Sequence, residues 1–486
     1  PPPQAAPSRK ETCFMHELTV LDLTIIVLYM IGMLLVGVWF VKRIKNTGDF
    51  YVAGRTLGPF VLTATVCASI IGGSAMMGRA GIAYTTGFKA IMTAIPYLIG
   101  MFIFSAIAGR IQEVGAARNI NSIPELFHYR FSRNARCILA LMIVFTMMGT
   151  VAAQVTATAT IIKMLGSEFG ISYEAGALVA TIIFIIYTAA SGLFGVVYTD
   201  VLQFFMLIIF VYILIPISSV RYLGNFSVFW QNLDKSYLVP HINGSILGDI
   251  VTYLVFTLAG AEMWQRAFAA KNKKSATRGM FWGTSIYMVT IALVFFMGLV
   301  AQQILPNVVA QYGSSDAVVP ALAISILPPG LTGLALAGIL SVMMSTADSY
   351  LLVSVQTFVH DLGKNFMPEM TEKHEILMSR IMSVVLAMGA LIIALYIKNA
   401  YNVLMFAWSF YAAAAGLSAL AALYWKKATN QGILSAMIGG FAVCVGWKLA
   451  GNPFGLGETV PGAVVCGLLL VTVSLATYKK SPCRMA

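Results

Sequence analysis

Residues 61–81 read VLTATVCASIIGGSAMMGRAG, an apolar stretch long enough to cross a bilayer but interrupted at its middle by Gly72 and Gly73. A second apolar stretch, residues 251–269, reads VTYLVFTLAGAEMWQRAFA and is interrupted in the same way by Gly260. Glycines can simply let two helices pack closely, which is the alternative interpretation. A matched pair of interruptions in two halves of a chain instead favours two broken helices in an inverted repeat, with a binding site at the breaks.

The composition places the chain in a membrane. Of its 486 residues, 59% are hydrophobic and only 10% are charged. A soluble domain usually carries about a quarter charged residues, so these side chains could not cover a surface in water. A spanning helix needs about 20 apolar residues, and about 13 stretches approach that length: 19–41, 58–78, 86–109, 135–162, 173–191, 196–220, 247–268, 279–304, 331–360, 377–398, 402–424, 432–450 and 459–478.

The spacing of the two interrupted segments predicts the organisation of the chain. We expect an all-α polytopic membrane protein with a five-plus-five inverted repeat, formed by residues 58–221 and 247–424. Residues 19–41 are expected to form one peripheral helix, residues 432–479 two more, and residues 480–486 a cytoplasmic tail.

Residues 1–18 are expected to be an N-terminal extension on the extracellular side. The first 14 residues, PPPQAAPSRKETCF, are proline-rich and contain no apolar core, so they do not form a secretory signal peptide. Met15 is a candidate natural start, in which case residues 1–14 would be an added leader.

The formal net charge is +12, and the distribution of the Lys and Arg residues along the chain indicates its orientation in the membrane. With the N-terminus outside, the inner side receives 22 of the 31 Lys and Arg residues: Lys42, Arg43, Lys45, Arg55, Arg110, Arg118, Arg130, Arg133, Arg136, Arg266, Lys271, Lys273, Lys274, Arg278, Lys364, Lys373, Arg380, Lys426, Lys427, Lys479, Lys480 and Arg484. This bias follows the positive-inside rule and favours an odd number of crossings. We therefore expect a multi-pass plasma-membrane protein with its C-terminus inside, and no nucleic-acid partner.

The sequence does not indicate an enzyme. None of the five histidines pairs with a cysteine at metal-ligand spacing, and the six cysteines show no paired spacing. A Gly-rich phosphate loop and a nucleophile–base pair at one depth are both missing from the sequence. We expect no catalytic residues, no organic cofactor, and function as a monomer.

An ionisable side chain in an apolar segment costs roughly 2.5–3.5 kcal/mol to insert and usually faces a cavity, a partner or an ion. The acidic candidates for such a role are Asp200, Asp249, Glu262 and Asp348. Asp249 lies near a segment end, and a carboxylate at a helix N-terminus is an alternative role for Asp200.

Asp348 is the deepest of the four and lies in SVMMSTADSYLLVS, residues 341–354. In a helix, Ser341, Ser345 and Ser349 recur on one side of this stretch. Hydroxyl oxygens, a carboxylate and carbonyls freed by a broken helix suit a hard monovalent cation. The alternative is that neighbouring hydroxyls simply satisfy Asp348.

Three stretches in this order resemble the sodium:solute symporter family: DFYVAGRTLGPF at 49–60, GLFGVVYTDVLQ at 192–203 and GILSVMMSTADSYLL at 338–352. MFAWSFYAAAAG at 405–416 is similar to the proline-type bacterial members. The family includes bacterial proline, sialic acid and galactose symporters and animal choline and glucose cotransporters. The resemblance implies a leucine-transporter-like fold and sodium-coupled uptake by alternating access.

The resemblance also implies a sodium site. It would use backbone oxygens of Ala68, Ile71 and Val342 with the hydroxyls of Ser345 and Thr346.

A second cation site, as in two-ion members, would use Asp200, Ser345, Asp348 and Ser349, and protonation of Asp348 is an open alternative. Arg55 matches an arginine linked to ion coupling. Ile70 stands where the proline-type carriers have a carboxylate, which weakens the transfer of their specificity.

The solute is expected against the first break and opposite the second, in contact with Gly72, Gly73, Ser74, Gln154, Glu262, Trp264, Gln265, Trp408 and Tyr411. A carboxylate among aromatic rings favours an amine or zwitterion, through charge pairing or cation–π attraction. Alternatively, Glu262 pairs with Arg266 four residues on, and Arg79 and Lys89 near the outer mouth favour an anionic solute.

We therefore expect sodium-coupled symport of an amino acid, amine or similar zwitterion. The alternatives are a sodium- or proton-coupled carboxylate symporter and, less favoured, an ion channel. The identity of the solute and the number of coupled ions stay open.

Overall fold

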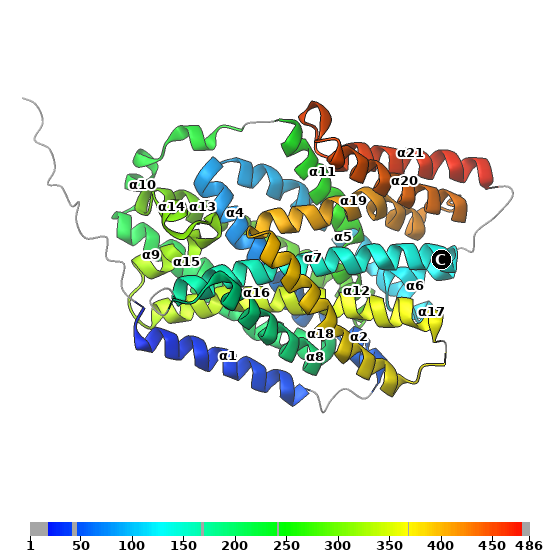
Figure 1. Ribbon diagram of the computed structural model, residues 1–486, viewed down its shortest axis with the longest axis horizontal. Helices are drawn as coiled ribbons and strands as arrows, with labels where there is room; N and C mark the ends of the chain where they lie inside the picture. The colour runs from blue at the N-terminus through cyan, green and yellow to red at the C-terminus, as the bar shows by residue number, and fades with distance from the viewer. Residues whose placement is uncertain (1–17, 41–45, 167–169, 241–242, 368, 479–486) are drawn as a thin grey trace, which may run out of the picture.

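The computed structural model describes residues 18–40, 46–166, 170–240, 243–367 and 369–478, and over these residues the chain is helical without strands (Figure 1). Eleven helices in this part are long and apolar enough to cross a membrane, or twelve when one bent pair counts as a span. The remaining expected segment, 173–191, contains a shorter apolar stretch, Tyr173–Ile186. The expected all-α polytopic architecture is confirmed.

The long helices form one bundle whose members lie roughly along a common direction (Figure 1). They are α1 (Val20–Phe40), α3 (Pro59–Ile70), α4 (Gly73–Thr86), α5 (Lys89–Arg118), α7 (Arg133–Leu165), α8 (Tyr173–Met206) with η4 (Leu207–Ile213) and α9 (Leu214–Leu223), α11 (Gly244–Ala259), α12 (Ala261–Ala269), α13 (Lys273–Ile304), α16 (Leu331–Gln356) with η7 (Thr357–Gly363), α18 (Glu372–Tyr396), α19 (Ala400–Tyr424), α20 (Asn430–Leu449) and α21 (Thr459–Thr477).

Short helices connect the long ones: α2 (Thr47–Val52), η2 (Ala53–Arg55), α6 (Ile123–Arg130), α10 (Phe226–Asn232), η5 (Lys235–Leu238), α14 (Val308–Tyr312), η6 (Ser315–Ala317), α15 (Val318–Ile326), α17 (Lys364–Phe366) and η8 (Pro453–Gly455). The sequence did not predict α15, which is apolar and buried but has only nine residues. A helix of that length is too short to span a bilayer.

Several helices begin before their apolar cores because polar residues cap them. Ser132 accepts a hydrogen bond from the Ala135 amide at the start of α7, and Asn272 accepts one from Ser275 at the start of α13. Such caps satisfy amides that the first helical turn leaves unpaired. The helices therefore include charged first turns that the hydrophobic pattern alone excluded.

The helix α16 forms the centre of the bundle, and its spanning window is completely buried. It packs against α1, α3, α7 and α8. By contrast, α1 lies at one edge of the bundle, and α20 and α21 lie together at another (Figure 1). The chemistry-bearing stretch 341–354 is therefore in the protein interior.

The expected segments 173–191 and 196–220 meet at Gly192, where α8 kinks and φ is 53°. Only glycine adopts this left-handed conformation without strain. The apolar stretches on the two sides of the kink, Tyr173–Ile186 and Gly192–Leu223, agree with two separate segments. Asp200 lies about two turns after the kink, beyond the first turn in which a helix N-terminus stabilises a carboxylate.

Candidate cation and solute sites

The first interrupted segment is broken at Gly72, where α3 ends and α4 begins after a bend of 47°. The Ile71 amide still bonds to the Cys67 carbonyl, and the Met76 amide bonds to the Gly72 carbonyl. Among the described residues, no backbone amide bonds to the carbonyls of Ala68 or Ile71. The break therefore leaves two buried carbonyl oxygens without the partners that a continuous helix would supply.

The glycines are needed because α16 lies against this break. A Cβ added at Gly72 would lie 3.0 Å from the Thr346 Oγ1 atom, and one added at Gly73 would lie 2.3 Å from the Met343 Cγ atom and 3.1 Å from the Gln154 Oε1 atom. The structure thus brings Gly72, Gly73, Thr346 and Gln154 together. The side chain of Ser74 is outside the described part of the structure.

Two hydroxyls of α16 are buried beside the break. Ser345 is 0% exposed and Thr346 is 2% exposed. Within the described part of the chain, neither the Ser345 Oγ nor the Thr346 Oγ1 atom forms a hydrogen bond, although the Asp200 carboxylate lies near the Ser345 hydroxyl. Because a buried hydroxyl without a partner is costly, an oxygen-binding ligand would stabilise this arrangement. Val342 is buried one turn earlier on the same helix.

The second interrupted segment is arranged differently. The helix α11 ends at Ala259, Gly260 has φ −53° and ψ 103°, and α12 begins at Ala261. The Trp264 indole donates to the Leu258 carbonyl at 3.0 Å, and the Tyr411 hydroxyl donates to the Ala259 carbonyl at 2.7 Å. Side chains therefore satisfy the carbonyls at this break, in contrast to those of Ala68 and Ile71.

Glu262 lies fully buried just after the second break. Its Oε1 atom accepts a hydrogen bond from the Tyr350 hydroxyl at 3.1 Å, and its Oε2 atom has no partner. The Glu262 carboxylate also interacts electrostatically with the hydroxyls of Tyr97 and Tyr411. A carboxylate oxygen without a partner among the described residues can receive a cationic group.

The proposed pairing of Glu262 with Arg266 is wrong. The Arg266 guanidinium forms its ion pair with Asp200, with 3.4 Å between Nη2 and Oδ2. Its hydrogen bond to Glu262 goes to the main-chain carbonyl and not to the side chain. Both side chains of the ion pair are 0% exposed. Arg266 is also not at the inner surface, where the charge distribution had placed it.

The other residues of the expected solute site connect the second break to α7, α16 and α19. The Gln265 amide donates to Gln356 at 2.7 Å, and the Trp408 indole donates to Thr150 at 2.9 Å. The Trp408 ring stacks on Phe256, with centroids 3.8 Å apart and planes within 5°. Trp408 and Tyr411, both on α19, thus support α11 next to its break.

Arg79 is not exposed at an outer mouth. It is 4% exposed, donates to the Tyr287 hydroxyl, and lies over the rings of Tyr97, Tyr253 and Tyr287 with centroid distances of 5.8, 5.1 and 5.7 Å. Such cation–π contacts stabilise a desolvated guanidinium. The side chain is held by aromatic rings and is not available to a solute at the entrance.

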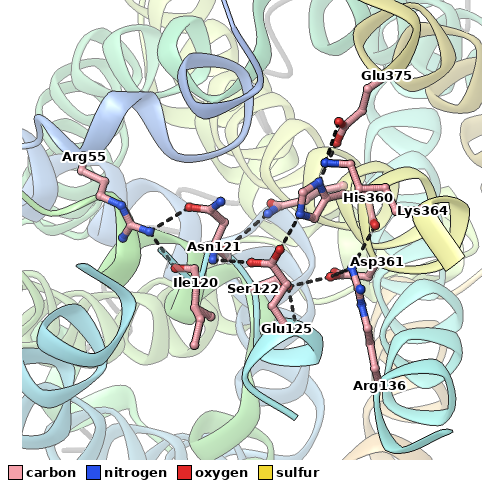
Figure 2. Close-up of polar contacts among 11 residues, drawn as sticks. Arg55, Ile120, Asn121, Ser122, Glu125, Arg136, His360, Asp361, Lys364 and Glu375 are labelled. Atoms are coloured by element: carbon pink, nitrogen blue, oxygen red, sulfur yellow. Dashed lines mark hydrogen bonds and ion pairs between the residues drawn. The ribbon is translucent and has the colours of Figure 1, made fainter. Parts of the chain in front are cut away.

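Arg55 lies away from the break in α3 and α4. Its guanidinium donates to the carbonyls of Phe268 at 3.0 Å and Ile120 at 2.7 Å, and to the Asn121 side chain at 2.8 Å (Figure 2). These bonds join the end of α12 to the loop between α5 and α6. Arg55 thus links the segment just before α3 to the end of α12, the helix that carries Glu262.

Beside Arg55 lies a polar network that the sequence did not predict. The two nitrogens of His360 each lie 2.6 Å from a carboxylate, that of Glu125 on α6 and that of Glu375 on α18, and Arg136 pairs with Asp361 at 3.3 Å (Figure 2). Burial alone would raise the pKa of Glu125, but the contact with His360 outweighs it and holds that pKa below its usual value. The network joins α6, η7, α7 and α18 at one end of the bundle.

The comparisons with known proteins agree with this geometry. The model of the sodium:solute symporter family matches residues 50–440. The osmoregulated proline transporter OpuE of Bacillus subtilis is 26% identical, covering 93% of this chain and 94% of that protein. The sodium/proline symporter of Escherichia coli is 28% identical over 92% and 91%, and the sodium/pantothenate symporter of Haemophilus influenzae is 30% identical over 82% and 84%.

Solved structures show the same fold. A substrate-bound, outward-open Na⁺-coupled sialic acid symporter superposes with a TM-score of 0.80 at 17% identity, covering 96% of this chain and 99% of that one. Mhp1, a nucleobase-cation-symport-1 family transporter, gives 0.61 at 13% identity, over 89% and 95%. These likenesses confirm the expected inverted-repeat, leucine-transporter-like fold.

Proposed function

Because this chain belongs to the sodium:solute symporter family, we propose that it carries an amino acid, amine or similar zwitterion across the membrane together with sodium, by alternating access. It would act as a monomer in the plasma membrane, with its N-terminus outside and its C-terminus inside. Residues 58–221 and 247–424 would form the two repeats, since the breaks at Gly72 and Gly260 occupy the first segment of each.

One observation carries the proposal. The unpartnered hydroxyls of Ser345 and Thr346 lie against a helix break whose carbonyls, at Ala68 and Ile71, also lack backbone partners. Oxygen atoms are the ligands that hard cations take. With the Val342 carbonyl, these groups would hold one sodium ion between α3 and α16, two helices that belong to different repeats.

The solute would bind between the two breaks. The Oε2 atom of Glu262 would receive an ammonium group, and the rings of Tyr97 and Tyr411 would contact it. Gly73 and Gln154, which lie together at the first break, would contact the rest of the solute. Several relatives are named for proline, which makes proline the first zwitterion to test.

A cavity beside α11 is lined by charged side chains. This cavity of about 560 Å³ is lined by Lys89 and Asp249, and by Lys448 and Glu458, which pair with each other at 2.8 Å. Both signs of charge are therefore present.

The energy of one coupled ion is sufficient for concentrative uptake. A sodium ion moving inward across about 100 mV releases ~2.3 kcal/mol, and a tenfold concentration ratio adds ~1.4 kcal/mol. The sum supports accumulation of a neutral solute by roughly 500-fold. Coupling requires that sodium favour the conformation that binds the solute better.

Uptake into proteoliposomes tests the proposal. Labelled proline, a primary amine and a carboxylate are offered to the full chain with an inward sodium gradient, and with choline replacing sodium. We expect sodium-dependent accumulation of the zwitterion above equilibrium, and no accumulation in choline. Sodium current without solute movement would indicate a channel, and equal uptake in choline would refute sodium coupling.

A further inference from the structure

Arg79 on α4 is a buried cation that forms no ion pair in the described part of the chain. Its Nη1 atom donates to the Tyr287 hydroxyl, and among these residues its buried Nε atom has no hydrogen-bond partner. An arginine in a protein interior is normally paired, because an uncompensated buried charge is costly. The rings of Tyr97, Tyr253 and Tyr287 offset part of this cost through cation–π attraction, but they are neutral. The guanidinium therefore still lacks an anion.

Glu262 on α12 shows the opposite imbalance. Its side chain is fully buried, and it also forms no ion pair among the described residues, where Arg266 pairs with Asp200. Its Oε1 atom accepts a hydrogen bond from the Tyr350 hydroxyl at 3.1 Å, and its Oε2 atom receives no donor there. The described part of the bundle thus contains one buried cation and one buried carboxylate that no ion pair neutralises.

One aromatic residue interacts with both of these charges. The Arg79 guanidinium lies over the Tyr97 ring, 5.8 Å from its centroid, and the Tyr97 hydroxyl interacts electrostatically with the Glu262 carboxylate. The Tyr97 ring also stacks on Trp408, with centroids 5.9 Å apart and planes 17° from parallel. The two unpaired charges are therefore neighbours of the same tyrosine, beside a tryptophan that the sequence assigns to the solute site.

This pair of charges is complementary to a zwitterion. A guanidinium can hold a carboxylate with two parallel N–H···O bonds, and the Nε atom of Arg79 is a donor available for such a bond. A simple amine at Glu262 would leave Arg79 without an anion, and a simple carboxylate at Arg79 would leave Glu262 without a cation. Only a solute that carries both groups neutralises both side chains.

We propose that Arg79 binds the carboxylate of the solute while Glu262 binds its ammonium group, so that the carrier accepts amino acids and discriminates against simple amines and simple carboxylates. This inference rests on the proposed sodium-coupled function. It makes Arg79 a specificity-determining residue, and it selects one of the solute classes that the sequence left open.

The positions of the two residues also relate solute binding to the conformation of the carrier. Arg79 lies on α4, which follows the first break, and Glu262 lies on α12, which follows the second. A solute held by both side chains would therefore join the half-helices that follow the two breaks, one from each proposed repeat. Binding would favour the conformation in which both contacts can form at once.

Three ligands with the same five-membered ring test the proposal on the purified full chain in saturating sodium. Proline carries both charges, prolinamide keeps only the ammonium group, and tetrahydrofuran-2-carboxylate keeps only the carboxylate. In displacement of labelled proline, we expect proline to bind about 10- to 150-fold more tightly than either analogue. An analogue that binds as tightly as proline would overturn the inference, whereas the absence of sodium-dependent proline binding would count against the proposed function itself.

Two substitutions give a crossed comparison with these ligands. Arg79→Gln should weaken the binding of proline and of tetrahydrofuran-2-carboxylate about 10- to 150-fold, while the binding of prolinamide changes less than threefold. Glu262→Gln should instead weaken proline and prolinamide and spare tetrahydrofuran-2-carboxylate. An equal loss for all three ligands in Arg79→Gln would show that Arg79 only supports the fold, and it would overturn the inference.

Arg79→Lys separates the charge of the side chain from its other contacts. It keeps a cation at this position but cannot form a bidentate pair, so we expect it to retain part of the preference for proline over prolinamide. A preference no greater than that of Arg79→Gln would contradict binding of the carboxylate by this charge. The comparison of the three ligands on the wild-type protein needs no substitution, and it decides the question if the variants fail to fold.

Discussion

The substitution Thr346→Val removes one proposed sodium ligand and keeps nearly the same shape against Gly72. The Thr346 Oγ1 atom is buried and unpartnered, so its only proposed role is to contact the ion. A contact between a hydroxyl and a charged group is worth about 1.5–3 kcal/mol. We therefore expect the sodium concentration for half-maximal proline uptake to rise about 10- to 150-fold, with uptake at saturating sodium retained.

For the same substitution, the structure predicts that the stability of the sodium-free protein is not reduced. Removing a buried hydroxyl without a partner relieves a desolvation cost, so the melting temperature of Thr346→Val in sodium-free detergent should equal or exceed that of the wild type. Thr346→Ser keeps the hydroxyl and should keep near-normal sodium dependence. Ser341→Ala is a matched control, because that hydroxyl already donates to the Gly338 carbonyl at 2.6 Å. A half-maximal sodium concentration within twofold of the wild type would refute the ligand assignment.

Three further predictions follow from the same contacts. Glu262→Gln should raise the half-saturating concentration of proline about 10- to 150-fold while sodium binding changes less than threefold; equal effects on both would place Glu262 outside the solute site. Gly73→Ala should lower the free energy of unfolding by about 1–3 kcal/mol, because its Cβ would lie 2.3 Å from the Met343 Cγ atom. Gly58→Ala is the control, since no atom lies within 4 Å of the added Cβ. Equal melting temperatures of the two variants would contradict the tight packing at Gly73. The pKa of Glu125 is lower in the folded protein than in the unfolded chain, where it is about 4.3. The ionised side chain should therefore stabilise the protein above about pH 4.3, and this effect should be lost as pH falls through the folded pKa. The melting temperatures of the wild type and Glu125→Gln should consequently converge at acid pH, and a constant difference would oppose this assignment.

The sequence predicted the breaks because glycines interrupt two apolar segments at matching places in the two halves of the chain. Gly72 and Gly260 both mark helix ends in the structure, and the stretch around Ser345 lies on the central helix. Hydrophobic patterning also found nearly every long helix. These features depend on local composition and periodicity, which a single sequence contains.

Partners between distant segments were not predictable in this way. Arg266 lies four residues from Glu262, and a helical pair was a reasonable interpretation, but the guanidinium instead crosses to Asp200 on another helix. His360 binds Glu125 across 235 residues of sequence. Tertiary packing also decides whether a carbonyl freed at a helix break receives another donor. The Ala259 carbonyl accepts from the Tyr411 hydroxyl, whereas the Ala68 carbonyl receives no backbone amide among the described residues.

The most direct measurement is a pair of high-resolution density maps of the protein, prepared in sodium and in choline with proline present. The account predicts a sodium-dependent density in contact with the Ala68 and Ile71 carbonyls and the Ser345 and Thr346 hydroxyls. An ion located elsewhere, or either hydroxyl turned away from the break in the sodium-bound map, would contradict it.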